Sequence, residues 1–181
     1  MEKHFKFQPI TIQPVFQDFS VKVENWEFFE GVLIQIHFSS DGAHSIEGSG
    51  VMVAPGVALS AKHVIKPHLD GIQKKMDATI CTAITKHGLA IWRISKITLV
   101  PKSDLVILGL ISASELPPDN KFYQCPISTL MPKIGDRLTI IGFKANDKSF
   151  ERKDKELFAT GHVYACQGEV TERYPAQRDS S

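Results

Sequence analysis

Short apolar stretches with a period of two recur along the chain and limit the folds that it can adopt. From Val32 to Phe38 apolar residues occupy every second position, and the polar Gln35 and His37 lie between them. Such alternation places the apolar side chains on one face of a β-strand, and few segments of the chain keep the spacing of a helix instead. We therefore predict an all-β fold in which this segment is a half-buried strand.

Other segments show the same composition of Val, Ile, Thr and Phe between turn-forming residues. Pro55-Gly56 suits a tight turn, because proline fixes one φ angle and glycine tolerates a positive one. The stretch Leu105–Leu110 is almost wholly apolar, which predicts a strand buried on both faces. The further predicted strands are Gly50–Ala54, Val57–Ser60, Thr79–Thr85, Ala90–Val100, Leu105–Leu110, Arg137–Phe143 and Leu157–Ala165.

Two polar segments divide this pattern. SASELPPDN, from Ser112 to Asn120, concentrates turn formers and a proline pair, so we expect a linker between two subdomains there. KANDKSFERKDK, from Lys144 to Lys155, holds five basic and three acidic residues. We predict a solvated hairpin loop for this segment, with a loop that shapes substrate binding as the alternative.

Charge and cysteine content exclude several classes of function. The chain has 21 Lys and Arg against 20 Asp and Glu, so nothing in its net charge of +1 favours a nucleic acid or an anionic membrane as partner. Cys81, Cys125 and Cys166 are too few and too scattered for a disulfide framework or a zinc site, and we expect buried thiols. We expect no metal and no cofactor. The N-terminus lacks the apolar run of a signal peptide, and no stretch is long enough to span a bilayer, so we expect a cytoplasmic protein.

A histidine and an aspartate stand out for their surroundings. His63 follows the apolar strands of GSGVMVAPGVALSAKHVI, which runs from Gly48 to Ile65. Asp104 leads directly into the apolar LVILGL, where desolvation of a carboxylate costs free energy unless a group donates a hydrogen bond to it. An imidazole N–H can be that donor, and the carboxylate then orients the imidazole as a base. Each residue alone also fits a structural role, as a histidine with a local partner or an aspartate in a turn.

These two segments resemble those of trypsin-like (chymotrypsin-fold) serine proteases, most closely the bacterial HtrA-like and glutamyl-endopeptidase-like branches. GSGVMVAPGVALSAKHVI is similar to their histidine hairpin and SDLVILGL to their aspartate strand; IGDRLTIIGF and ATGHVYA resemble strands of their second barrel. The resemblance implies two six-stranded antiparallel β-barrels, with His63 as general base and acid and Asp104 as its orienting carboxylate. It divides the chain into an N-terminal arm (1–30), a first barrel (31–111), a linker (112–120) and a partial second barrel (121–181).

The third member of the family's triad has no match in the chain. The nucleophilic serine belongs in a Gly-x-Ser-Gly loop whose N–H groups also bind the oxyanion, and no such loop follows Asp104. Ser49 has flanking glycines in EGSGV but precedes the histidine, and Cys166 in YACQGEV lacks the glycines, so we expect neither to be the nucleophile. A metal site formed by His63 and His68 is disfavoured, because their spacing suits neither a helix face nor a strand face.

The missing loop leads to a specific functional expectation. We expect a serine endopeptidase that acts on a polypeptide in its full-length form, whereas the 181-residue chain itself is inactive. The 61 residues from Lys121 to Ser181 are too few for a closed six-stranded barrel, which needs about 70. We therefore expect the natural chain to continue past Ser181, so that this segment or a partner strand completes the second barrel. The alternative is a pseudoprotease or protein-interaction module on the same fold.

Overall fold

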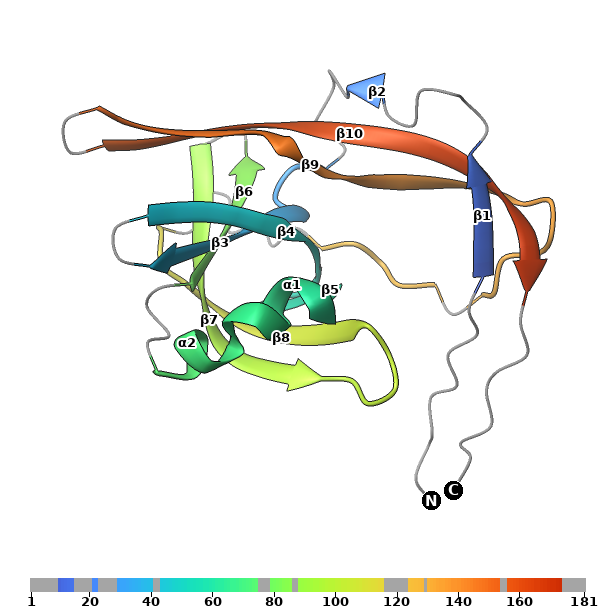
Figure 1. Cartoon of the computed structure of the whole chain (residues 1–181), viewed down its shortest axis with the longest axis horizontal. Coiled ribbons are helices and arrows are strands. Elements are labelled where there is room, and N and C mark those ends of the chain that lie inside the picture. The colour runs from blue at the N-terminus through green and yellow to red at the C-terminus, as the bar shows by residue number, and fades with distance from the viewer. Residues whose placement is uncertain are drawn as a thin grey trace. The chain divides into compact units, whose positions relative to one another are not determined.

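The computed structural model describes residues 10–14, 21–22, 29–40, 43–74, 79–85, 88–115, 124–128, 130–153 and 156–173. These residues are mostly β-structure, which confirms the predicted class (Figure 1). The first strands are β1 (Ile10–Pro14), β2 (Val21–Lys22), β3 (Leu33–Ser40), β4 (Ala43–Ala54) and β5 (Val57–Ala61). A helical segment follows, made of α1 (Lys62–Ile65), η2 (Lys66–His68) and α2 (Leu69–Lys74). The remaining strands are β6 (Thr79–Thr85), β7 (Gly88–Leu99), β8 (Leu105–Ser112), β9 (Arg137–Lys153) and β10 (Glu156–Arg173).

Six strands close into a barrel in the order β3-β4-β5-β8-β7-β6. All neighbouring strands of this barrel are antiparallel, and β3 pairs with β6 to complete the ring. The alternation read from the sequence is confirmed, because Ile34 and Ile36 on β3 are fully buried in the core. Val106 and Leu108 of β8 join them there, so the apolar faces of opposite strands form one continuous core.

Two details of burial differ from the prediction. Gln35 and His37 of β3 are also buried, so this strand is covered on both faces, and the His37 ring lies 2.6 Å from the Thr82 hydroxyl of β6. On β8 the residues between the core positions are only half-buried, and the prediction of a strand buried on both faces was wrong there. A barrel strand needs only its inward face buried, whatever the apolarity of its other face.

The turn between β4 and β5 has the predicted chemistry. Gly56 has a φ angle of 70°, which only glycine adopts without strain. Its carbonyl oxygen accepts a hydrogen bond from the N–H of Leu110, at 2.8 Å. The turn therefore also connects to the neighbouring strand β8.

A second, partial sheet combines strands from before and after the barrel in the sequence. β10 pairs with β1 and β2, both from the segment expected to be an N-terminal arm, and also with β9. Val170 of β10 is fully buried, whereas Leu130, Ile134 and Ile140 expose 85%, 65% and 50% of their surface. Together with the barrel, this partial sheet gives the expected fold class, one closed antiparallel barrel and an incomplete second part.

The charged segment from Lys144 to Lys155 is not the predicted loop. β9 continues through it to Lys153, and β10 begins at Glu156, so only residues 154–155 separate the strands and these lie outside the described residues. The prediction failed because main-chain hydrogen bonds hold an antiparallel pair together whether or not its side chains are apolar. A run of charged residues therefore does not end such a hairpin.

The chain divides into two compact units. One comprises residues 1–22, 128–141 and 164–181, and the other comprises residues 23–127 and 142–163, which include the closed barrel. The expected linker at 112–120 falls partly outside the described residues, so the boundaries drawn from the sequence stay predictions. Within the described residues, no helix has the length and apolarity that a membrane crossing requires.

Candidate active site

Strand pairing brings His63 and Asp104 together at the rim of the barrel. β5 ends at Ala61, and β8 begins at Leu105, which pairs with Ala61 in the antiparallel register. His63 lies two residues beyond the end of β5, and Asp104 immediately precedes β8. The two residues, distant in sequence, are thus placed side by side by neighbouring strands of one barrel.

The short helix that carries His63 is seated on β4. Ile65 of α1 is fully buried in the barrel core. Val64 packs over Gly48, where a Cβ atom would lie 2.7 Å from a valine methyl carbon. Any larger residue at position 48 would push the helix outward. The first glycine of the GSG sequence therefore serves close packing of the His63 helix.

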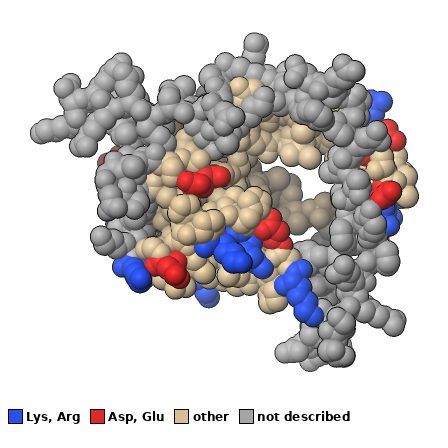
Figure 2. Space-filling model, viewed as in Figure 1, with Lys and Arg blue, Asp and Glu red and all other residues tan. Residues whose placement is uncertain are grey.

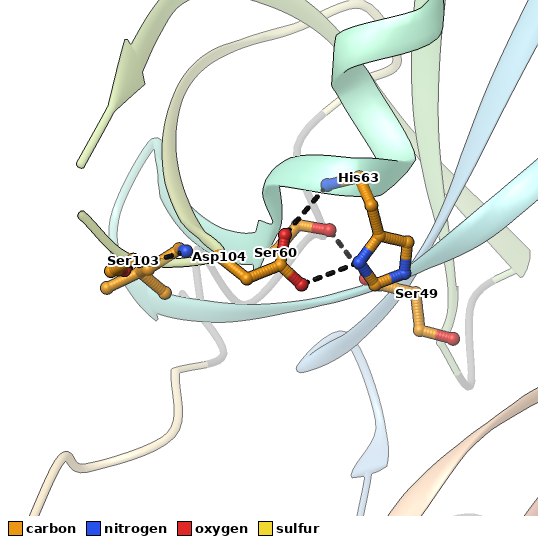
Figure 3. A network of polar contacts seen from close by, with 6 residues as sticks. Ser49, Ser60, His63, Ser103 and Asp104 are labelled. Carbon is orange, nitrogen blue, oxygen red and sulfur yellow. Dashed lines mark hydrogen bonds and ion pairs between the residues drawn. The ribbon is translucent and has the colours of Figure 1, made fainter. Parts of the chain in front are cut away.

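Three hydrogen bonds join the end of β5 to Asp104. The His63 ring atom Nδ1 lies 2.6 Å from Oδ2 of Asp104, and the backbone N–H of His63 donates to Oδ1 at 3.0 Å. The N–H of Lys62 donates to the backbone carbonyl oxygen of Asp104 at 2.6 Å. Figure 3 shows the carboxylate facing both the ring and the backbone N–H of His63. Both carboxylate oxygens are thus engaged, and the ring orientation is defined.

The turn before β8 orients the aspartate. The hydroxyl of Ser103 accepts a hydrogen bond from the N–H of Leu105 at 2.9 Å. The N–H of Val100 donates to the carbonyl oxygen of Leu105 at 3.0 Å, which closes the turn between β7 and β8. Sequence reasoning missed the roles of Ser103 and Gly48. A serine two residues before a strand is a signal for the first, as a hydroxyl can close a local turn.

The electrostatics of the pair favour a charged carboxylate. The pKa of Asp104 is lowered, chiefly by the hydrogen bond from the His63 side chain and also by the hydrogen bond from its backbone N–H, against the opposing effect of desolvation. An ionised carboxylate only accepts hydrogen bonds, so Nδ1 of His63 carries the proton and the other ring nitrogen, Nε2, is the free basic atom of the neutral imidazole.

The pair lies open to solvent. The His63 and Asp104 side chains are 73% and 58% exposed, so the expected desolvated aspartate is not what the structure shows. Asp104 belongs to the turn at the barrel rim and only the strand after it enters the core, which explains the difference. The donor that we expected for the carboxylate, the imidazole of His63, is present nevertheless.

Among the described residues, no serine is hydrogen-bonded to Nε2 of His63. Ser49 lies on β4, and its hydroxyl accepts a hydrogen bond from the N–H of Phe143 at 3.0 Å. Ser60 donates its hydroxyl proton to the carbonyl oxygen of Ser49 at 2.8 Å. In the part of the chain that the structure describes, the hydrogen bonds of His63 join it to Asp104 and none joins its ring to a serine.

The cysteines occupy three different environments. Cys81 is fully buried in the barrel, and burial raises the pKa of its thiol to about 12. Cys166 is half-buried on β10, one residue beyond the predicted strand Leu157–Ala165, and is less enclosed than expected. Cys125 is exposed, which corrects the expectation of buried thiols; its backbone N–H donates to the carbonyl oxygen of Met52 in a segment without regular structure.

The two histidines of the disfavoured metal site have separate partners. His63 pairs with Asp104, whereas the His68 ring stacks on Phe38 with 4.0 Å between the ring centroids. Nε2 of His68 lies 3.7 Å from a carboxylate oxygen of Glu47. Among the residues that can be described, no group of three or more His, Cys, Asp or Glu side chains is placed to hold a metal ion.

Comparison with known proteins supports the fold through structure and not through sequence. No protein-family model matches the chain, and no curated protein matches it by sequence. It is similar to the structure of human heparin binding protein, with a TM-score of 0.54 and 14% identity over 84% of this chain and 65% of that one. The fold is that of the trypsin-like serine proteases.

Two further solved structures have TM-scores below 0.5 and add no weight. A structure described as GrC has a TM-score of 0.49 and 14% identity, with 81% of this chain and 63% of that chain covered. A mutant of human heparin binding protein has a TM-score of 0.48 and 12% identity, with 81% and 62% covered. The chain spans less than two thirds of each of these three proteins. The trypsin-like fold is therefore shown, and the activity is a separate question.

Proposed function

We propose that the chain carries the base and the orienting carboxylate of a trypsin-like serine endopeptidase. The observation that carries this proposal is the contact between Nδ1 of His63 and Oδ2 of Asp104, at 2.6 Å on the rim of the closed barrel. A second contact, in which the backbone N–H of His63 donates to Oδ1, engages the other carboxylate oxygen. The exposure of the ring supports the proposal too, because a base must reach its substrate.

In the proposed mechanism His63 moves one proton twice. Its Nε2 takes the proton from a serine hydroxyl as the oxygen attacks the scissile carbonyl carbon of a polypeptide, and then gives it to the leaving amine. Asp104 stays charged and stabilises the imidazolium that forms between the two steps. The serine and the N–H groups that bind the oxyanion come from outside these 181 residues, because no serine after Asp104 has flanking glycines.

Charge supports a polypeptide as the substrate. The net charge is +1, and on the face shown in Figure 2 the acidic and basic side chains of the described residues are interspersed. On this face the described residues form no extended region of one charge sign that would attract a polyanion. We keep the cytoplasmic location and the bacterial HtrA-like or glutamyl-endopeptidase-like branch as parts of the proposal. The proposed location rests on the amino-terminal composition, and the proposed branch rests on the histidine and aspartate segments.

A fluorophosphonate probe tests the proposal in the full reading frame. We expect the probe to label a serine beyond position 181 and peptide hydrolysis to be lost in His63→Ala. His68→Ala is the matched control, because His68 lies in the same helical segment but does not contact Asp104. The 181-residue chain should remain unlabelled. A labelled serine within it, or full activity of His63→Ala, would contradict the proposal.

A second candidate is a binding module without catalysis. It is favoured by the absence of a serine hydrogen bond to His63 within the described residues. The two candidates differ in the full reading frame. An intact second barrel without a Gly-x-Ser-Gly loop would support the binding module, whereas such a loop would support the endopeptidase.

A further inference from the structure

Ser49 connects two parts of one compact unit that are far apart in sequence. Its hydroxyl accepts a hydrogen bond from the N–H of Phe143 on β9, at 3.0 Å. The two residues belong to the unit formed by residues 23–127 and 142–163. Gly142 lies so close that a Cβ atom there would be 3.4 Å from the Ser49 hydroxyl oxygen. The backbone of β9 therefore packs directly on this serine.

The same serine is also joined to the strand that leads to His63. Its carbonyl oxygen accepts the hydroxyl proton of Ser60 at 2.8 Å, and Ser60 lies three residues before His63 on β5. Its neighbour Gly48 is the residue over which Val64 of the His63 helix packs. Figure 3 shows Ser49, Ser60 and His63 close together. Ser49 is therefore at the meeting point of β4, β5 and β9.

The Phe143 amide depends on Ser49 for its acceptor. In the described residues β9 pairs only with β10, so the opposite edge of β9 has no partner strand. An N–H on such an edge is left to water unless a side chain accepts its proton. Phe143 is half-buried, and the Ser49 hydroxyl is the acceptor that the structure provides.

We infer that Ser49 is a positioning residue that holds the start of the β9–β10 hairpin against the barrel strand on which the His63 helix is seated. This role explains why EGSGV has a hydroxyl between two glycines without making Ser49 a nucleophile. The small neighbours allow close approach, and the hydroxyl supplies one directed contact. The inference does not depend on whether His63 is catalytic.

Amide hydrogen exchange measured by NMR tests this role in the 181-residue chain. In Ser49→Ala we expect the Phe143 amide to exchange about tenfold faster, because local opening no longer breaks a hydrogen bond. Ser49→Thr keeps the hydroxyl and should restore the wild-type rate. Ser95→Ala is the matched control, since Ser95 also makes a hydroxyl contact to the backbone, with the carbonyl oxygen of Gly109, and should leave the Phe143 rate unchanged.

Two results would overturn the inference. One is an equal Phe143 exchange rate in Ser49→Ala and the wild type. The other is fast exchange of the Phe143 amide in the wild-type chain. This exchange rate can be measured without any variant. His63→Ala should not change the Phe143 rate, so failure of the proposed catalytic role and failure of this positioning role are separate outcomes.

Discussion

The closed barrel and the partial second sheet differ in how many of their apolar side chains are buried. In the barrel Ile36, Val106 and Leu108 are fully buried in one continuous core. Along the segment that leads into and forms the start of β9, Ile134 and Ile140 are at least half exposed. Closure removes free edges and gives every inward side chain neighbours on all sides. The comparison teaches that the two rim residues lie next to strands with a buried inward face, whereas the start of β9 leaves apolar side chains exposed.

The largest expected effect tests whether the barrel rim carries the catalytic pair. In the full reading frame, Asp104→Asn should lower kcat roughly 10⁴-fold, because an amide favours the wrong tautomer of His63. The measurement is steady-state hydrolysis of a peptide substrate. Glu47→Gln, which changes the carboxylate next to His68 in the same way, is the control and should retain activity. Similar losses in both variants would argue against a specific role for Asp104.

Thiol labelling compares the two regions without any substitution. Cys81 lies in the barrel core with a pKa raised to about 12 by burial, whereas Cys166 is half-buried on β10. We expect iodoacetamide to modify Cys81 at least about 10³-fold more slowly than Cys166, because Cys81 reacts only after global unfolding. Peptide mapping over time gives both rates. In urea Cys81 and Cys166 should react at equal rates. Equal rates in the native chain as well would show that the barrel does not protect Cys81.

Truncation of a side chain should destabilise the barrel much more than the sheet. Leu108→Ala removes a fully buried side chain and should lower the free energy of unfolding by about 3 kcal/mol. Ile140→Ala is the matched change on β9, where half of the side chain is already exposed, and it should cost less than about 1 kcal/mol. Urea titration measures both. Equal losses would mean that the exposed sheet residues have a partner in solution.

The smallest expected effect is the acid dependence of the rim contact. Because His63 lowers the pKa of Asp104 below its ordinary value of 3.8, the folded chain binds a proton at this carboxylate less readily than the unfolded chain. The contact therefore adds stability above pH 3.8 and loses it as the pH falls through the lower pKa of the folded state. Urea titrations of the wild type and Asp104→Asn across this range should converge at the acid end. A constant difference would exclude the linkage.

The barrel was largely predictable because its strands are set by local pattern. Alternation along Val32–Phe38 and the Pro55-Gly56 turn depend on side chains close in sequence, and the strand and the turn were confirmed, although the strand is buried on both faces and not on one. The juxtaposition of His63 and Asp104 was also anticipated, since a carboxylate at the start of an apolar strand needs a donor. Their catalytic role stays a prediction.

Other features that depend on contacts distant in sequence were not predictable. The extension of β9 to Lys153 rests on pairing with β10, to which side-chain apolarity gives no guide. The exposure of Asp104 depends on its place at the rim, and that of Cys125 on the path of its segment across the surface. The packing of Val64 over Gly48 depends on how the His63 helix lies against β4, and the sequence alone does not indicate this.

The pairing of β5 with β8 also has a consequence for how the protein matures. Ala61 and Leu105 meet only after the intervening helical segment, β6 and β7 have been accommodated, and such long-range pairing is a slow step in folding. A nascent chain that has made only local hairpins therefore lacks the His63–Asp104 contact. If His63 is the catalytic base, closure of the barrel is therefore one requirement for proteolytic activity, because only then are the base and its carboxylate in contact.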